Sequence, residues 1–168
     1  MNRGCVAFIS ALVGVFGCTA PSTFQGNQLH GAWRVAAMHL ISADQDTVEV
    51  SVQESLFIFG DGYYSIAYAF GDERSAAYAE RWHASDREKV ARFSSLIVNA
   101  GSYRINGSHL YAQPLFALAP EFVEGQAVFS FQFVEDVLEL TWERSVAFDG
   151  LEYPSAGTVT LLSLVRVN

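Results

Sequence analysis

The stretch "SLFIFGDGYYSIAYAF", residues 55–70, contains two runs rich in aromatic and β-branched residues, separated by Gly60-Asp61-Gly62. Aromatic and β-branched side chains favour strands, and the Gly-Asp-Gly sequence accepts the positive φ angles of a tight turn. The stretch therefore predicts a β-hairpin. It decides the fold class, because most of the chain on either side repeats the same pattern.

Strand-like segments continue on both sides of the hairpin. They cover residues 32–41, 47–53, 102–105, 109–116, 126–134, 137–144 and 157–167. The segment 126–134 shows the clearest alternation, with Phe129, Phe131 and Phe133 on one side of the strand. Many short strands joined by turns are typical of an up-and-down barrel or a sandwich, so a mainly β domain is predicted.

One segment in the middle of the chain has the pattern of a helix. Ser85-Asp86-Arg87-Glu88 has the sequence of a capping box, with Ser at the N-cap and Glu three residues later. Val90, Phe93, Leu96 and Ile97 then recur at helical spacing, and Gly101 follows as a stop. We expect one amphipathic helix whose apolar stripe packs on the sheet or plugs one end of it.

Composition and charge exclude several classes of function. Hydrophobic residues make up 51% of the 168 residues, which is enough for a substantial core in one domain. The net charge is −8, and no basic cluster exists in the sequence. An acidic surface repels phosphate backbones and anionic lipid headgroups, so neither nucleic-acid binding nor membrane binding through a basic patch is expected.

The amino-terminal region has the features of an export signal. Arg3 precedes an uncharged apolar run at residues 4–17, which is shorter than the roughly 20 residues that span a bilayer. Val15-Phe16-Gly17-Cys18 resembles the lipobox of bacterial lipoproteins, although Phe16 replaces the small residue that is commoner there. An ordinary secretory signal with an incidental cysteine is the alternative, but Pro21 disfavours ordinary cleavage after Ala20.

The lipobox resemblance implies a lipid anchor on Cys18. Residues 1–17 would be the signal peptide, residues 18–28 the lipidated cysteine and a flexible tether, and residues 29–168 the folded domain. Several acyl chains together hold a protein stably on a membrane, whereas one chain holds it weakly. The residue after the cysteine is Thr19, which resembles the residue found there in lipoproteins that reach the outer membrane. We therefore expect the protein at the periplasmic face of the outer membrane.

Three features together resemble bacterial lipocalin-like domains. They are the G-x-W sequence Gly31-Ala32-Trp33, an arginine near the far end, Arg166, and the central run from "FSSLIVNAGSYRING" to "LELTWER". The resemblance covers about residues 29–168 and implies an antiparallel up-and-down lipocalin-like barrel. It also implies that Arg166 lies across Trp33 and closes the barrel through a cation–π contact. The histidine that these domains often carry after the "aGtY" strand is absent, because Leu110-Tyr111-Ala112-Gln113 stands there.

Alternation along the strands identifies candidate residues for the barrel interior. If Trp33 points inward, His39 shares its face, and the hairpin would contribute one face of alternate residues. The predicted ligand-binding residues are His39, Leu56, Ile58, Tyr64, Tyr68, Phe129, Phe131 and Trp142. Such a lining could form an apolar pocket with a few polar groups, but a filled core is the alternative, because small barrels are often filled by their own side chains.

The leading hypothesis is a non-enzymatic lipoprotein whose barrel binds a small apolar molecule, with no cofactor. The four histidines lack metal-ligand spacing, and neither a nucleophile elbow nor a phosphate-binding loop is present in the sequence. One alternative is an isomerase or cyclase that uses His39 and a pocket tyrosine as acid and base. Another alternative is a structural partner in the cell envelope.

The lipobox prediction is tested by Cys18→Ser in the full chain expressed in a bacterium with a lipoprotein pathway. We expect loss of labelling by radioactive palmitate and accumulation of the uncleaved precursor, because the thiol that would form the thioether bond to the lipid is gone. Labelling or processing that is unchanged in the variant would contradict the lipobox interpretation.

Overall fold

The hairpin predicted at residues 55–70 forms two paired antiparallel strands, β3 (Val52–Gly60) and β4 (Tyr63–Phe70). The computed structural model describes residues 28–73, 75–155 and 157–167. Gly60 pairs with Tyr63, so the turn consists of Asp61 and Gly62. This hairpin is the centre from which the sheet continues on both sides.

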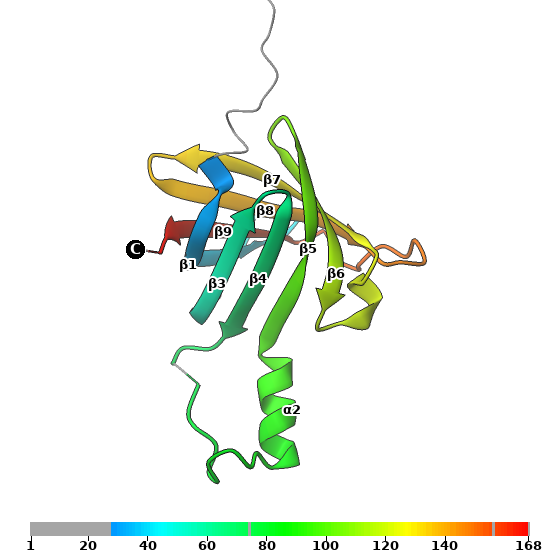
Figure 1. The fold of residues 1–168 in the computed structure, drawn as a ribbon. Coiled ribbons are helices and arrows are strands. Elements are labelled where there is room, and N and C mark those ends of the chain that lie inside the picture. The colour runs from blue at the N-terminus through cyan, green and yellow to red at the C-terminus, as the bar shows by residue number, and fades with distance from the viewer. Residues whose placement is uncertain (1–27, 74, 156, 168) are drawn as a thin grey trace, which may run out of the picture.

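The strands of the described chain form a closed antiparallel barrel (Figure 1). The remaining strands are β1 (Gly31–Ile41), β2 (Thr47–Glu49), β5 (Leu96–Asn106), β6 (His109–Ala117), β7 (Gln126–Val134), β8 (Val137–Val146) and β9 (Val159–Arg166). From β3 to β9 each strand pairs with the next along the chain, and β9 pairs with β1, which pairs with β3. The short β2 adds to the far half of β1. This closure makes the fold an up-and-down barrel and excludes the sandwich.

One end of the barrel is closed by the contact predicted between its first and last strands. The Arg166 guanidinium carbon lies 4.2 Å from the centre of the Trp33 ring, and the two residues are opposite one another in the β1–β9 ladder. Arg166 also donates hydrogen bonds to the carbonyls of Gln28 (2.7 Å) and His30 (2.9 Å). Glycine is favoured at position 31, because its φ of +132° is one that other residues rarely adopt and because a Cβ there would lie 2.6 Å from Arg166 Nη1.

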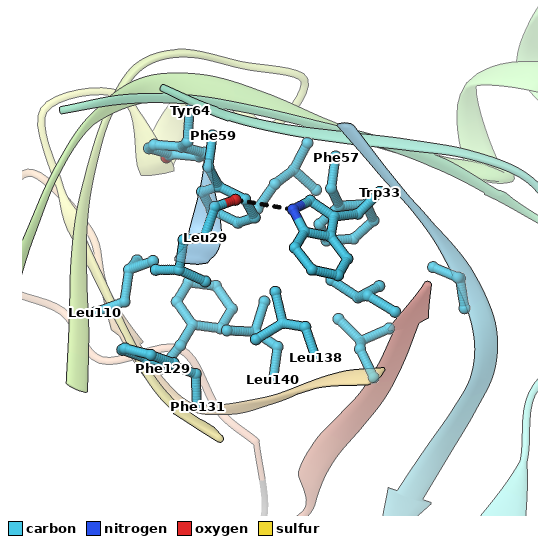
Figure 2. Close-up of a cluster of buried hydrophobic side chains, with 14 of the residues drawn as sticks. Leu29, Trp33, Phe57, Phe59, Tyr64, Leu110, Phe129, Phe131, Leu138 and Leu140 are labelled. Carbon is cyan, nitrogen blue, oxygen red and sulfur yellow. Dashed lines mark hydrogen bonds between the residues drawn. The ribbon is translucent and has the colours of Figure 1, made fainter. Parts of the chain in front are cut away.

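The half of the barrel beside this contact is filled by side chains (Figure 2). Leu29, just before β1, is fully buried, and its carbonyl accepts a 2.8 Å hydrogen bond from Trp33 Nε1. Leu138 and Leu140 from β8 pack in the same cluster. Burial of large apolar side chains stabilises a fold by roughly 1.5–3 kcal/mol each, so this half provides much of the core.

The predicted helix is present but shorter than expected. Helix α2 (Asp86–Ser94) begins with the predicted capping box, in which the Ser85 and Glu88 side chains bond each other's backbone N–H groups. The prediction was wrong beyond Ser94, because β5 begins at Leu96 and Gly101 lies within that strand. Pairing of residues 96–102 with β4 replaces the two further helical turns.

The expected packing of the helix on the sheet was also wrong. No residue of α2 is buried, and Val90 and Phe93 are 65% and 58% exposed. Figure 1 shows the helix projecting from one end of the barrel. Its last turn is held by Arg92, whose guanidinium donates to Glu54 on β3 (2.9 Å) and to the Ser75 hydroxyl. No helix among the described residues is long and apolar enough to cross a membrane.

The approach of β5 and β6 at Gly101 gives a test of the fold. A Cβ at Gly101 would lie 2.0 Å from the Gln113 carbonyl oxygen, which is a backbone atom and cannot rotate away. We expect Gly101→Ala to lower the free energy of unfolding, measured in urea, by about 1–3 kcal/mol.

Gly60→Ala is the matched control, because a Cβ at Gly60 meets no atom within 4 Å. Its free energy of unfolding should remain within about 0.5 kcal/mol of the original value or rise slightly. Equal destabilisation by both substitutions would contradict the close approach at Gly101.

Candidate functional site

The end of the barrel opposite Trp33 and Arg166 contains a cavity of about 300 Å³. It lies among the start of β5, the end of β6, the first residues of β7 and β9, and the end of β8. Phe93 and Ser94 at the end of α2, and Phe122 of the 3₁₀ helix η1 (Pro120–Phe122), also line it. The barrel interior is therefore filled in one half and hollow in the other.

The walls of the cavity are mainly apolar. Its floor adjoins the packed half through Phe57, Phe129 and Leu162, which are all buried. Another part of the wall consists of aliphatic residues from β5, β6 and the segment that follows β6, namely Leu96, Ile97, Val98, Pro114, Ala117, Leu118 and Ala119. A concave apolar space with few polar groups is the usual form of a small-molecule site.

A few uncharged polar side chains interrupt the apolar walls. Tyr68, Thr160 and Ser145 are buried and carry hydroxyl groups. The Ser145 hydroxyl accepts a 2.9 Å hydrogen bond from Trp142 Nε1, which fixes the indole at the cavity wall. Among the described residues that line the cavity there is no Asp, Glu, Lys, Arg or His.

The connection between β8 and β9 folds back beside the cavity. Val146 forms an isolated bridge with Glu152, and the Tyr153 N–H donates to the Ser145 carbonyl (2.8 Å). The Tyr153 ring then lies 5.3 Å from that of Trp142 and 5.8 Å from that of Phe122, measured between centres. These three rings form an aromatic cluster, of which Trp142 and Phe122 line the cavity.

Burial perturbs the two inward-facing tyrosines of β4. Desolvation raises the pKa of Tyr68 to about 12, with a further contribution from the nearby Tyr153 phenol. Desolvation also raises the pKa of Tyr64, whose hydroxyl is sealed in the packed half without a hydrogen-bond partner. Both phenols are neutral near pH 7, as an unperturbed tyrosine would be, and burial keeps them neutral to a higher pH.

Five of the predicted interior residues face inward, but they divide between the two halves of the barrel. Tyr68, Phe129 and Trp142 line the cavity. Tyr64 and Phe131 belong to the buried cluster and do not line the cavity. The sequence pattern thus identified the inner face correctly at these positions, but it did not distinguish packed from hollow regions.

The prediction for Leu56 and Ile58 was wrong, because these side chains are 43% and 44% exposed. Their neighbours Phe57 and Phe59 face inward instead. The reason is the register of the hairpin, in which Phe59 is opposite Tyr64. Directly opposed residues share a face, so the odd-numbered residues of β3 join the even-numbered residues of β4.

The prediction for His39 was also wrong. β1 has a bulge between Val35 and Ala37, which changes the alternation so that Met38, not Ala37, is buried. His39 is therefore opposite Leu161, whereas the adjacent Thr160 and Leu162 face the cavity. One extra residue in a strand moves every later side chain to the other face. His39 and Tyr68 consequently lie on opposite faces of the barrel wall.

Several cavity residues were not predicted from the sequence. The alternation of Thr160, Leu162 and Leu164 in the last strand was a usable signal, since all three are buried. Leu96 and Ile97 were assigned to the helix, so their place in the cavity wall could not be foreseen. Ser145 gave no signal, because its role depends on the position of the Trp142 ring.

A second hollow, of about 500 Å³, lies outside the closed end of the barrel. It is more open, and it includes Glu135, Asp136 and Arg166. Arg166 already contacts Trp33 and two carbonyls, so this hollow is the outer side of the closing contact. Within the described ranges, no three His, Cys, Asp or Glu residues are grouped closely enough to hold a metal ion.

The chain was compared with protein-family models, curated proteins and solved structures. No protein-family model matches the chain, and no curated protein matches its sequence. A lipocalin-like protein from Bacteroides uniformis is similar in structure, with a TM-score of 0.43 and 14% sequence identity over 83% of this chain and 99% of that chain. The description of the fold as a closed antiparallel barrel therefore rests on the strand pairing itself.

The buried phenol of Tyr68 predicts a pH dependence of stability. Above pH 10 the unfolded chain loses the Tyr68 proton, whereas the folded protein keeps it until about pH 12. The folded state then binds more protons, so its free energy of unfolding falls by about 1.4 kcal/mol per pH unit for this group. We expect Tyr68→Phe to show a shallower fall between pH 10 and 12 in urea unfolding. Identical slopes in the two proteins would contradict the burial of this hydroxyl.

Proposed function

We propose that this protein binds a small apolar molecule in the cavity at the open end of its barrel. The observation that carries the proposal is the division of the interior into a packed half and a hollow half. The hollow is not a packing defect of the core, because side chains from β3 to β9, α2 and η1 converge on it. Its volume of about 300 Å³ lies at the lower end of the range for ligand pockets, about 300–1,000 Å³.

The composition of the walls supports binding rather than catalysis. Tyr68 is the titratable residue that lines the cavity, and its raised pKa makes it a poor base near neutral pH. The isomerase or cyclase alternative required His39 beside Tyr68, but the bulge in β1 removes His39 from the interior. The hollow interior likewise favours a ligand over a purely structural role.

The proposal extends to anchoring at a membrane through Cys18, which lies outside the described residues. The described chain starts at Gln28, beside Arg166 at the closed end of the barrel. A tether attached there leaves the cavity at the opposite end free. This arrangement supports an exported lipoprotein of the outer membrane that holds a ligand facing away from its point of attachment.

Binding is tested with N-phenyl-1-naphthylamine, an uncharged probe whose fluorescence rises in apolar surroundings. We expect a saturable rise with the folded domain, and an affinity at least tenfold lower for Ala127→Phe, because Ala127 lines the cavity and the larger ring would fill it.

The control is Ala36→Phe, the same substitution at an exposed alanine of β1. It should leave the probe affinity unchanged. Equal loss of binding in both variants would mean that the probe does not bind in the cavity. An original protein that binds neither this probe nor, in native mass spectrometry, any ligand from its host would overturn the proposed function.

A further inference from the structure

Resting on the proposed function, we infer that the ligand is an uncharged molecule with an oxygen-bearing polar end, such as a long-chain ester, ketone or alcohol, and not an ionised fatty acid. The inference rests on two features of the cavity. Its walls contain no charged side chain, and the polar side chains that line them are neutral, namely Tyr68, Ser94, Asn99, Gln126, Trp142, Ser145 and Thr160.

The absence of charge is specific to the cavity, because the chain as a whole carries 18 acidic and 10 basic residues besides its histidines. An ionised carboxylate that leaves water for this cavity would find no cation among the described lining residues. Burying an unpaired charge is far more costly than burying a neutral polar group. The cavity therefore selects against anions and cations alike.

Arg144, next to Ser145 on β8, is exposed and does not line the cavity. Three further basic residues lie on α2, which contributes Phe93 and Ser94 to the wall. The Arg92 guanidinium is paired with Glu54 at 2.9 Å and also bonds Ser75. Lys89 is paired with Asp86 at 3.0 Å. Arg87 is exposed on the helix and does not line the cavity. Neither these three residues nor Arg144 therefore places a cation in the cavity lining.

The hydroxyl groups provide hydrogen bonds for a neutral polar end. Neither the Tyr68 nor the Thr160 side chain has a hydrogen-bond partner among the described residues, and both line the cavity. The Tyr64 hydroxyl, by contrast, is sealed in the packed half and cannot reach a ligand. Trp142 Nε1 is already used by Ser145 Oγ, which keeps its own proton for donation. An ester, ketone or alcohol oxygen is a suitable acceptor for these donors.

Three molecules with the same C16 chain test the inference by displacement of N-phenyl-1-naphthylamine at pH 8. They are methyl palmitate, which is neutral, palmitate, which is anionic, and hexadecylamine, which is cationic. We expect methyl palmitate to displace the probe at a concentration at least tenfold lower than either charged molecule. Palmitate or hexadecylamine binding as tightly as the ester would overturn the inference while leaving the proposed function in place.

Two variants locate the selectivity in the cavity. Tyr68→Phe should weaken the binding of methyl palmitate several-fold. The affinity for hexadecane, which has no polar end, should stay unchanged. Asn99→Lys places a cation at the cavity wall and should improve palmitate binding about tenfold relative to the ester. Equal effects of Tyr68→Phe on the ester and the alkane, or no gain for palmitate, would contradict the assignment. Displacement by none of these molecules, hexadecane included, would instead overturn the proposed function and the inference with it.

Discussion

The structure depends on the pairing of β1 with strands on both of its sides. Its first residues pair with β3, and most of its length pairs with β9, so the first and last strands of the sheet become neighbours. Trp33 and Arg166 reinforce this closure at one end, where a ring, a guanidinium and two backbone carbonyls meet. Without this pairing the sheet would have two open edges, and its inner face would have no second wall to pack against.

Closure creates an interior that two different sets of residues occupy. Near Trp33, large side chains from β1, β3 and β8 meet at the axis and fill it (Figure 2). Towards the other end, β5, β6 and β7 contribute smaller residues such as Val98, Pro114 and Ala127, and the space between them stays open. The same barrel thus combines a conventional hydrophobic core with a cavity, and the sizes of the side chains decide where one ends and the other begins.

Local alternation in the sequence was sufficient to predict most of the strands, whereas the closed barrel and the contact between Trp33 and Arg166 were expected only from the resemblance to lipocalin-like domains. It failed where one residue changes a register. The two-residue turn after Gly60 placed Phe57 and Phe59 inside instead of Leu56 and Ile58, and the bulge in β1 excluded His39. The end of α2 was missed because pairing with β4 outweighs the helical spacing of Leu96 and Ile97. The register of a strand and the point where a helix ends depend on pairing with other strands, which the local pattern of residues does not show.

The two ends of the barrel also depend on the solvent in different ways. The packed end is held by buried apolar contacts, which ordinary salt concentrations hardly change. Helix α2 has no buried residue, and the ion pair that connects it to the barrel, Arg92 with Glu54, has side chains about one third exposed. Partly exposed ion pairs are screened by salt. Raising the ionic strength therefore weakens the attachment of α2 and loosens the part of the cavity wall that Phe93 forms. The packed end of the barrel keeps its geometry.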